Sequence, residues 1–187
     1  MIVKCEGLKI GKYSIPAFEL HEGELIGICL YNGSHLYDLE MELVNYFTGV
    51  IKSSQLEVHQ KMTFVEHFKE SRIKDMFLPM SVGKYLKIYG KEGSKELERI
   101  YEIDYINRKT KIHSLAGTPR KWLSLFATFS KSKHIVFDMV GQDPIGSDKT
   151  LDYVREFVNK GDSAILLDNF DDSEPKCDRF YRIKIEE

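Results

Sequence analysis

The sequence has only three cysteines, Cys5, Cys29 and Cys177, and no long apolar segment. Few, widely spaced cysteines exclude a disulfide framework and a cysteine-based zinc site, and they favour a reducing cytoplasm. The longest apolar runs are far shorter than the roughly 20 residues that span a bilayer, and the N-terminus lacks the pattern of a signal peptide. If the protein works at a membrane, we expect another chain to hold it there.

Neither sign of charge predominates, since 27 Lys and Arg stand against 29 Asp and Glu. No basic stripe stands out along the sequence, so the composition gives no support for nucleic-acid binding. The length of 187 residues fits one domain that is large enough to bury a proper core. We therefore predict a single domain over residues 1–187.

The most informative stretch, residues 23–38, has the frame of a phosphate-binding loop. An apolar run, 25–30, leads into Asn32-Gly33 and then into a helical pattern. A working loop ends in Gly-Lys-Ser or Gly-Lys-Thr, where amides cradle phosphate, the lysine reaches the outer phosphates and the hydroxyl binds Mg²⁺. Here those three places hold His35, Leu36 and Tyr37. The stretch predicts the shape of a nucleotide site without its chemistry, and Asn-Gly is also an ordinary turn signal.

Strand-like and helical patterns alternate through the chain. We expect strands at 8–10, 14–20, 25–30, 56–65, 134–138, 164–168 and 180–185, and helices at 36–47, 82–89, 94–103, 120–129 and 148–160. Thr118 is expected to be the N-cap of the fourth helix, with Pro119 at its first position. This alternation predicts an α/β fold with a largely parallel core sheet.

The order of short motifs resembles the ATP-binding subunit of ABC transporters over nearly the whole chain. In the first half, the matches are Gly23-Glu24-Leu25-Ile26-Gly27 before the Walker A loop, Asn32-Gly33-Ser34 within it, Thr63 to His67 at the Q-loop and Met80 to Leu86 at the start of the helical subdomain. In the second half, they are Leu115-Ala116-Gly117 at the signature, Ile135 to Met139 at Walker B, Asp143-Pro144 at the D-loop, and Ala164 to Asp168 and Cys177-Asp178-Arg179 around the H-loop.

The resemblance implies a P-loop NTPase-like fold with a mostly parallel sheet flanked by helices, an antiparallel β edge and a shortened helical subdomain at about 82–118. It implies ATP and Mg²⁺ as cofactors, bound weakly or not at all. The implied nucleotide-site positions are Asn32, Gly33, Ser34 and His35 in the loop, Asp138 as the Mg²⁺ ligand, Leu115, Ala116 and Gly117 in the signature-like segment, Asp143, and Asp168 at the position of the switch histidine.

Several matched positions lack the family's reactive groups. Met139 stands where the family has the glutamate that polarises the attacking water, and a thioether cannot act as a base. Neither Asp168 nor its neighbour Asn169 can replace an imidazole that contacts the γ-phosphate. Asp38 places a negative charge in the first turn of a helix, where it satisfies the helix dipole without a ligand. We therefore expect no catalytic residues and negligible ATPase activity of the chain alone.

Three functions stay open at this point. The leading hypothesis is a pseudo-ATPase, cytoplasmic and peripheral at the inner face of the cell membrane, that partners a membrane permease and an active ATP-binding subunit or a second copy of itself. The second is a weakly active ATPase with Asp138 on Mg²⁺ and His35 on phosphate. Separately, the free amides behind Gly117 could contribute to the ATP site of a partner subunit. The third is a free-standing protein-interaction module.

Overall fold

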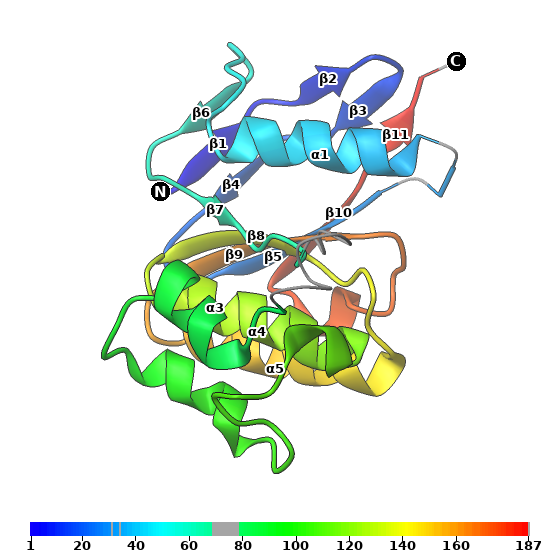
Figure 1. Ribbon diagram of the computed structural model, residues 1–187. Coiled ribbons are helices and arrows are strands. Elements are labelled where there is room, and N and C mark those ends of the chain that lie inside the picture. Colours follow the sequence, from blue (N-terminus) through cyan, green and yellow to red (C-terminus); the bar gives the residue numbers. More distant parts are fainter. Residues whose placement is uncertain (31, 34, 69–78, 187) are drawn as a thin grey trace. The chain divides into compact units, whose positions relative to one another are not determined.

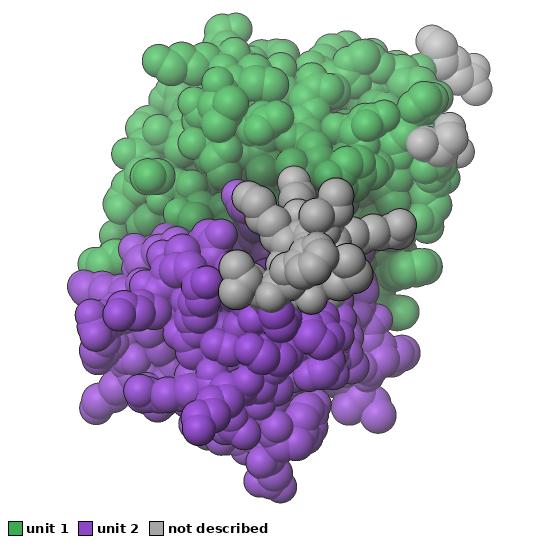
Figure 2. All heavy atoms as spheres, in the orientation of Figure 1, with its two compact units in different colours: residues 1–64, 133–139, 151–187 green, residues 65–132, 140–150 purple. Residues whose placement is uncertain are grey.

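The computed structural model describes residues 1–30, 32–33, 35–68 and 79–186 (Figure 1). Internal contacts divide the chain into two compact units, which Figure 2 distinguishes by colour. The sheet unit comprises residues 1–64, 133–139 and 151–187, and the helical unit comprises residues 65–132 and 140–150. The expected helical subdomain at about 82–118 falls within the helical unit, and the single domain over 1–187 stays a prediction.

A five-stranded parallel sheet forms the centre of the sheet unit. Its strand order is β10 (Arg179–Arg182), β5 (Leu25–Cys29), β9 (Ser163–Asp168), β8 (His134–Asp138) and β7 (Thr63–Phe64). Nearly all residues of β5, β8 and β9 are buried, as near-continuous apolar runs predict for strands covered on both faces. The expected α/β fold with a mostly parallel sheet is confirmed.

Two small antiparallel sheets complete the β structure of the sheet unit. One has the order β4 (Phe18–Leu20), β1 (Val3–Cys5) and β6 (Leu56–Val58), and the other has the order β11 (Lys184–Ile185), β3 (Tyr13–Ile15) and β2 (Leu8–Ile10). The single strand expected at 56–65 is wrong, because it is divided into β6 and β7, which belong to different sheets. The backbone N–H groups of His59 and Gln60 donate to Ile2 O instead of continuing a ladder, so the chain leaves the first sheet there.

The helix α1 (Leu36–Phe47) packs its apolar stripe into the core of the sheet unit. Leu39, Leu43 and Phe47 are buried in one cluster with residues of the parallel sheet and of β1 to β4. The spacing of these residues predicts this helix from the sequence, and its bounds agree with the prediction. Figure 1 shows α1 in cyan beside the antiparallel strands.

The helical unit contains α3 (Val82–Tyr89), η1 (Lys95–Glu102), η2 (Ile112–Ser114) and α4 (Gly117–Phe129), and it shares α5 (Pro144–Val158) with the sheet unit. The helix expected at 94–103 is a 3₁₀-helix. The α4 helix begins at Gly117, so the prediction of Thr118 as its N-cap is wrong. Within the described residues, none of the helices is long and apolar enough to cross a membrane.

Candidate functional site

The phosphate-loop-like segment connects β5 to α1 in the sheet unit. Asn32 and Gly33 are exposed there, and Ser34 lies outside the described residues. The imidazole of His35 is 71% exposed, and its Nδ1 lies 3.7 Å from Asp38 Oδ2 in the first turn of α1. The one basic group described between β5 and α1 is therefore a histidine that already has a carboxylate beside it.

Leu36 occupies the place where a phosphate loop has its lysine. Its side chain packs against the apolar core of the sheet unit, together with residues such as Leu39. Tyr37, at the place of the hydroxyl, is 61% exposed. The two positions that would hold phosphate and Mg²⁺ therefore serve packing and surface, and they do not fit the phosphates of a nucleotide.

An acidic loop lies against this segment. Asp168 ends β9, its backbone carbonyl accepts a hydrogen bond from Leu30 N at 2.7 Å, and Asn32 Nδ2 donates to Asn169 O at 3.2 Å. Residues 168–174 contain four acidic residues and no basic one. The loop therefore brings negative charge to the edge of the sheet where phosphate would have to sit.

Internal contacts stabilise the acidic loop. Asp168 accepts a hydrogen bond from Ser173 Oγ at 2.8 Å, and Arg182 Nη2 lies 3.2 Å from Asp171 Oδ2 and 2.6 Å from Glu174 Oε2. Hydrogen bonds from Cys29 and Arg182 lower the pKa of Asp171, which keeps that carboxylate ionised. Burial, together with Asp171, raises the pKa of the Cys29 thiol to about 11, so Cys29 is no nucleophile.

Asp138 is fully buried at the carboxyl end of β8, in register with Leu167 of β9. Its place beside the end of β9 brings it to the same edge of the sheet as Asp168, as the resemblance implies. Met139 follows it, so no carboxylate stands at the next position. Among the described residues, no group of three or more His, Cys, Asp or Glu side chains could hold a metal ion.

The signature-like and D-loop-like segments meet in the helical unit. Gly117 approaches Gly141 so closely that an added Cβ would lie 1.9 Å from Gly141 O. Thr118 Oγ donates to Asp143 Oδ2 at 2.8 Å, which explains why Thr118 does not cap α4. Asp143 Oδ1 accepts from Gly146 N at 2.9 Å. These bonds lower the pKa of Asp143, with the Gly146 amide as the largest cause.

The contacts of Asp143 explain why α5 begins earlier than the sequence pattern predicts. The helix begins at Pro144, directly after Asp143, whereas the sequence pattern predicts a start at residue 148. An aspartate that accepts a bond from the third helical amide, followed by proline at the first position, is a favourable helix start. The D-loop-like Asp143 therefore has a structural role in this chain, as an anchor of two helix N-termini.

A small cavity of about 150 Å³ lies within the helical unit. Its lining includes His67 of the Q-loop-like segment, Gly117 of the signature-like segment and Gly141. The structure thus brings together the Q-loop-like and signature-like segments, with Gly141, which lies two residues before the D-loop-like Asp143. Leu115 is buried, whereas Ala116 is exposed.

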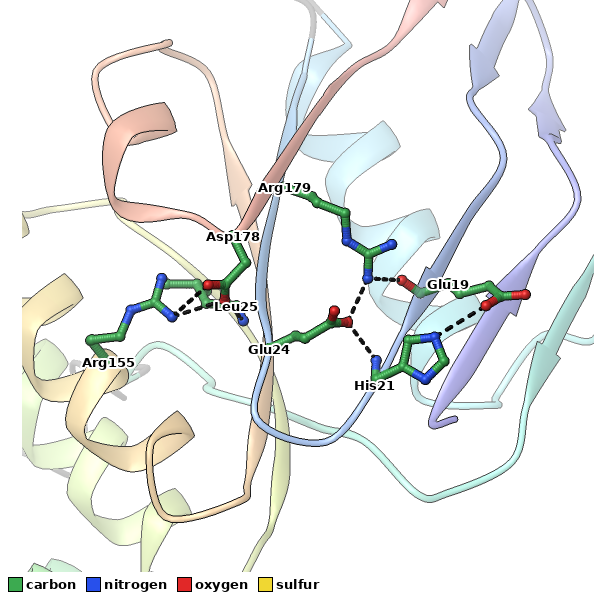
Figure 3. A network of polar contacts seen from close by, with 7 residues as sticks. All are labelled: Glu19, His21, Glu24, Leu25, Arg155, Asp178 and Arg179. Carbon is green, nitrogen blue, oxygen red and sulfur yellow. Dashed lines mark hydrogen bonds and ion pairs between the residues drawn. The ribbon is translucent and has the colours of Figure 1, made fainter.

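A polar network at the opposite end of β5 is absent from our sequence-based list of functional residues (Figure 3). Asp178 Oδ2 accepts a hydrogen bond from Leu25 N at 2.7 Å and pairs with Arg155 at 2.8 Å. Arg179 donates to Glu24 Oε2 and to Glu19 O, and Glu24 Oε2 also accepts from His21 N. The Gly-Glu and Cys-Asp-Arg motifs were the signal that could have revealed this network.

No protein-family model matches the sequence, and no curated protein matches it either. Solved structures do match. An ABC transporter ATP-binding protein from Pyrococcus furiosus aligns with 97% of this chain and 97% of its own, at a TM-score of 0.72 and 17% identity. The chain has the ATP-binding-cassette fold.

Two further cassettes give the same result. The cassette cbiO1 from Clostridium perfringens, part of the ABC transporter complex cbiONQ, matches 98% of this chain and 87% of its own, at a TM-score of 0.67 and 16% identity. A bacterial ABC transporter cassette with a dimeric structure matches 100% of this chain and 99% of its own, at a TM-score of 0.65 and 13% identity. At such identities the likeness shows the fold alone.

Motifs that resemble those of the family lie at both ends of the parallel strands. The Gly-Glu and Cys-Asp-Arg motifs, which the chain has, contact each other at the amino end of β5. The positions without phosphate-binding or catalytic groups, including Leu36, Met139 and Asp168, lie at the carboxyl ends of β5, β8 and β9. Ligands of open parallel sheets bind at the carboxyl ends of the strands. In this chain the Gly-Glu and Cys-Asp-Arg motifs join β5 to the segment that enters β10.

Proposed function

We propose that this chain is a pseudo-ATPase of the ABC transporter family, which acts as a structural or regulatory partner of a membrane permease. The cassette fold supports membership of the ABC transporter family. The loss of nucleotide chemistry is supported by the contrast between the two ends of β5, because the motif contacts are present at its amino end and the sequence lacks the family's phosphate-binding groups at its carboxyl end. The observation that carries the proposal is the packing of Leu36 against the core at the position of the phosphate-binding lysine.

Electrostatics add to this argument. A nucleotide triphosphate brings several negative charges, which a working site offsets with lysine and Mg²⁺. Here the acidic loop after β9 contacts the segment after β5 through the bond between Asn32 and Asn169 O. Arg182 is paired with Asp171 and Glu174 within that loop, so its charge is already offset. Phosphate at this edge would meet like charge, which disfavours binding.

A second argument concerns ATP hydrolysis, and it does not depend on whether the nucleotide binds. The attacking water needs a base or an orienting group beside the γ-phosphate. Met139 supplies neither, and Asp168 uses its carboxylate to accept from Ser173 Oγ and from the amide of Asn169. A chain that lacks these groups has a binding role and not a catalytic one.

The partners follow from the family. The cassette cbiO1 is part of a transporter complex, and the dimeric cassette shows that this fold can pair with a second cassette. We infer that the chain binds a permease from the cytoplasmic side of the cell membrane, alone, as a homodimer or beside an active cassette. In a pair of cassettes, one catalytically silent subunit leaves the other subunit's activity to drive transport.

One observation favours the second candidate, a weakly active ATPase. Asp138 is a buried carboxylate at the carboxyl end of β8, where a cassette has its Mg²⁺ ligand. Gly117 is exposed at the start of α4, where the helix has free backbone amides. Such activity would take the form of a contribution by these amides to the nucleotide site of a partner subunit. Dimerisation that depends on ATP would favour this candidate over the pseudo-ATPase.

The partnership is tested by affinity purification of the tagged full chain from detergent-solubilised membranes of its own organism, after chemical cross-linking. We expect a polytopic permease among the recovered proteins, at a stoichiometric level. Recovery of neither a permease nor a second cassette subunit would contradict the proposal and would leave the interaction module as the better account. An unrelated tagged cytoplasmic protein of similar size is the control for non-specific capture.

A further inference from the structure

The two units of this chain carry opposite charge. The helical unit has fifteen Lys and Arg against ten Asp and Glu, whereas the sheet unit has twelve against nineteen. The net charge of −2 for the whole chain conceals this division. A basic surface on a nearly neutral protein is a local feature that attracts an anionic partner.

Six of the fifteen Lys and Arg of the helical unit lie on α3, just after it, or on the segment 108–111 beside it. Lys84, Lys87 and Ile88 are exposed, and their spacing places them on one face of α3. Val82, Tyr85 and Leu86 form the buried face of the same helix. The outward face of α3 is therefore basic with an apolar side chain within it.

Backbone contacts hold a second basic segment against the first turn of α3. Val82 N donates to Thr110 O at 2.9 Å, and Gly83 N donates to Arg108 O at 3.0 Å. Ser81 and Lys111 form an isolated β-bridge. These contacts bring Arg108, Lys109 and Lys111 beside the start of α3. We call the combined surface the basic face, and its residues are Lys84, Lys87, Lys91, Arg108, Lys109 and Lys111.

The two segments that form the basic face carry basic residues and no acidic ones. Residues 79–91 and 105–113 contain no Asp or Glu. Glu98 lies 3.4 Å from Arg108 and offsets that one charge. Exposed apolar side chains lie among the cations, with Ile88 54% exposed, Tyr89 44% exposed and Tyr105 63% exposed. The surface thus combines several ammonium groups with aliphatic and tyrosine side chains.

We propose that the basic face binds the anionic surface of a phospholipid membrane directly. Lysine ammonium groups are point charges that need no partner of fixed geometry, which suits a fluid layer of headgroups. Clusters of lysine beside exposed apolar side chains are typical of protein surfaces that lie on anionic lipid. Tyrosine prefers the boundary between headgroups and acyl chains. This contact with lipid is additional to any contact with a permease and does not need one.

The test is flotation of the purified full chain with vesicles of phosphatidylcholine alone and with vesicles of equal parts phosphatidylcholine and phosphatidylglycerol. We expect binding to the anionic vesicles only, and weaker binding as the salt concentration rises. Each lysine at an anionic surface strengthens binding about fivefold. The triple variant Lys84→Gln, Lys87→Gln, Lys109→Gln should therefore bind about a hundredfold more weakly.

A matched control changes the net charge equally outside the basic face. The variant Lys52→Gln, Lys61→Gln, Lys149→Gln neutralises three exposed lysines and should bind the anionic vesicles like the unaltered chain. Circular dichroism and thermal unfolding should show that both triple variants are folded. Absence of binding to anionic vesicles, or equal loss in the two triple variants, would overturn the proposal. Binding to single-stranded RNA in place of vesicles, abolished only by the first variant, would overturn it in favour of nucleic acid.

Discussion

The carboxylate of Asp178 accepts a hydrogen bond at 2.7 Å from the backbone N–H of Leu25, the first residue of β5. The two residues are far apart in the sequence, yet this bond joins the start of β5 to the segment that enters its neighbour β10. Arg155 of α5 pairs with the same carboxylate and also donates to Lys176 O. One side chain therefore connects a helix to two neighbouring strands of the parallel sheet.

Replacement of Asp178 tests this structural role. Asp178→Ala leaves the Leu25 amide without its acceptor and leaves the Arg155 guanidinium with Lys176 O as its acceptor, so we expect a loss of about 1–3 kcal/mol in the free energy of unfolding. Asp178→Asn retains one acceptor oxygen and should lose less. Urea unfolding followed by circular dichroism measures both values. The exposed neighbour Asp172 supplies the control, since Asp172→Ala should change stability by less than about 0.5 kcal/mol.

The close approach of Gly117 to Gly141 predicts intolerance of any side chain. A methyl group at Gly117 would lie 1.9 Å from Gly141 O, which is backbone and cannot rotate away. Gly117→Ala should therefore destabilise the protein by about 1–3 kcal/mol, the usual range for overpacking. Ala116→Ser, which adds one atom at the exposed N-cap of α4, should be neutral or stabilising. Equal melting temperatures for Gly117→Ala and the unaltered chain would show that the contact is absent.

Buried His134 predicts lower stability in acid. Its Nε2–H donates to Gln60 Oε1 at 2.9 Å, so the neutral ring accepts at Nδ1 from Ser163 Oγ at 2.7 Å. Burial lowers the pKa of His134 below its usual value near 6.5, and the smaller effect of Glu22 raises it. The folded state therefore binds the proton less readily than the unfolded state. The stability that this group contributes is present above pH 6.5 and is lost as the pH falls through the lowered pKa.

Thermal unfolding between pH 7.5 and pH 5 measures this effect, and His134→Gln is the comparison. The variant can bond to both partners without titrating, so its stability should fall less steeply than that of the unaltered chain over this range. Parallel curves for the two proteins would show that His134 does not contribute to the pH dependence.

Restoring the missing lysine should not restore a nucleotide site. Leu36 packs against the core, so Leu36→Lys should lower the free energy of unfolding by about 1–2 kcal/mol. Tyr37→Lys places the same charge on an exposed neighbour and should be nearly neutral. We expect neither variant to bind Mg-ATP, because the acidic loop after β9 remains. Micromolar affinity in Leu36→Lys alone would show that the lysine is the one missing part.

The sequence predicts the buried strands, α1 and α3 well because long apolar runs and regular spacing decide them locally. The predictions from the sequence are wrong where contacts between residues far apart in the chain decide the structure. The chain leaves the sheet after β6 because Ile2 O accepts the next amides, and α5 starts early because Asp143 bonds to Thr118 and Gly146. The basic face escaped notice because its lysines lie in two segments that only the fold brings together.

The sequence alone proposes which reactive groups the site lacks, and that stays a prediction, whereas the geometry of the site follows only from the fold. A motif comparison assigns Leu36 to the position of a lysine, but only the fold shows that its half-buried side chain packs against the core. The structural use of Asp143 and of the Cys-Asp-Arg motif also depends on partners far away in the sequence. Such roles follow from tertiary contacts, which a local pattern does not encode.

Calorimetric titration of the purified chain with Mg-ATP, and with a non-hydrolysable analogue, tests the central claim most directly. Three features predict no binding heat up to millimolar nucleotide: the half-buried Leu36 packed against the core, Met139 after Asp138, and the acidic loop that contacts Asn32. Stoichiometric binding in the micromolar range, with ADP found in the calorimeter cell after the titration with Mg-ATP, would contradict the account and favour the weakly active ATPase.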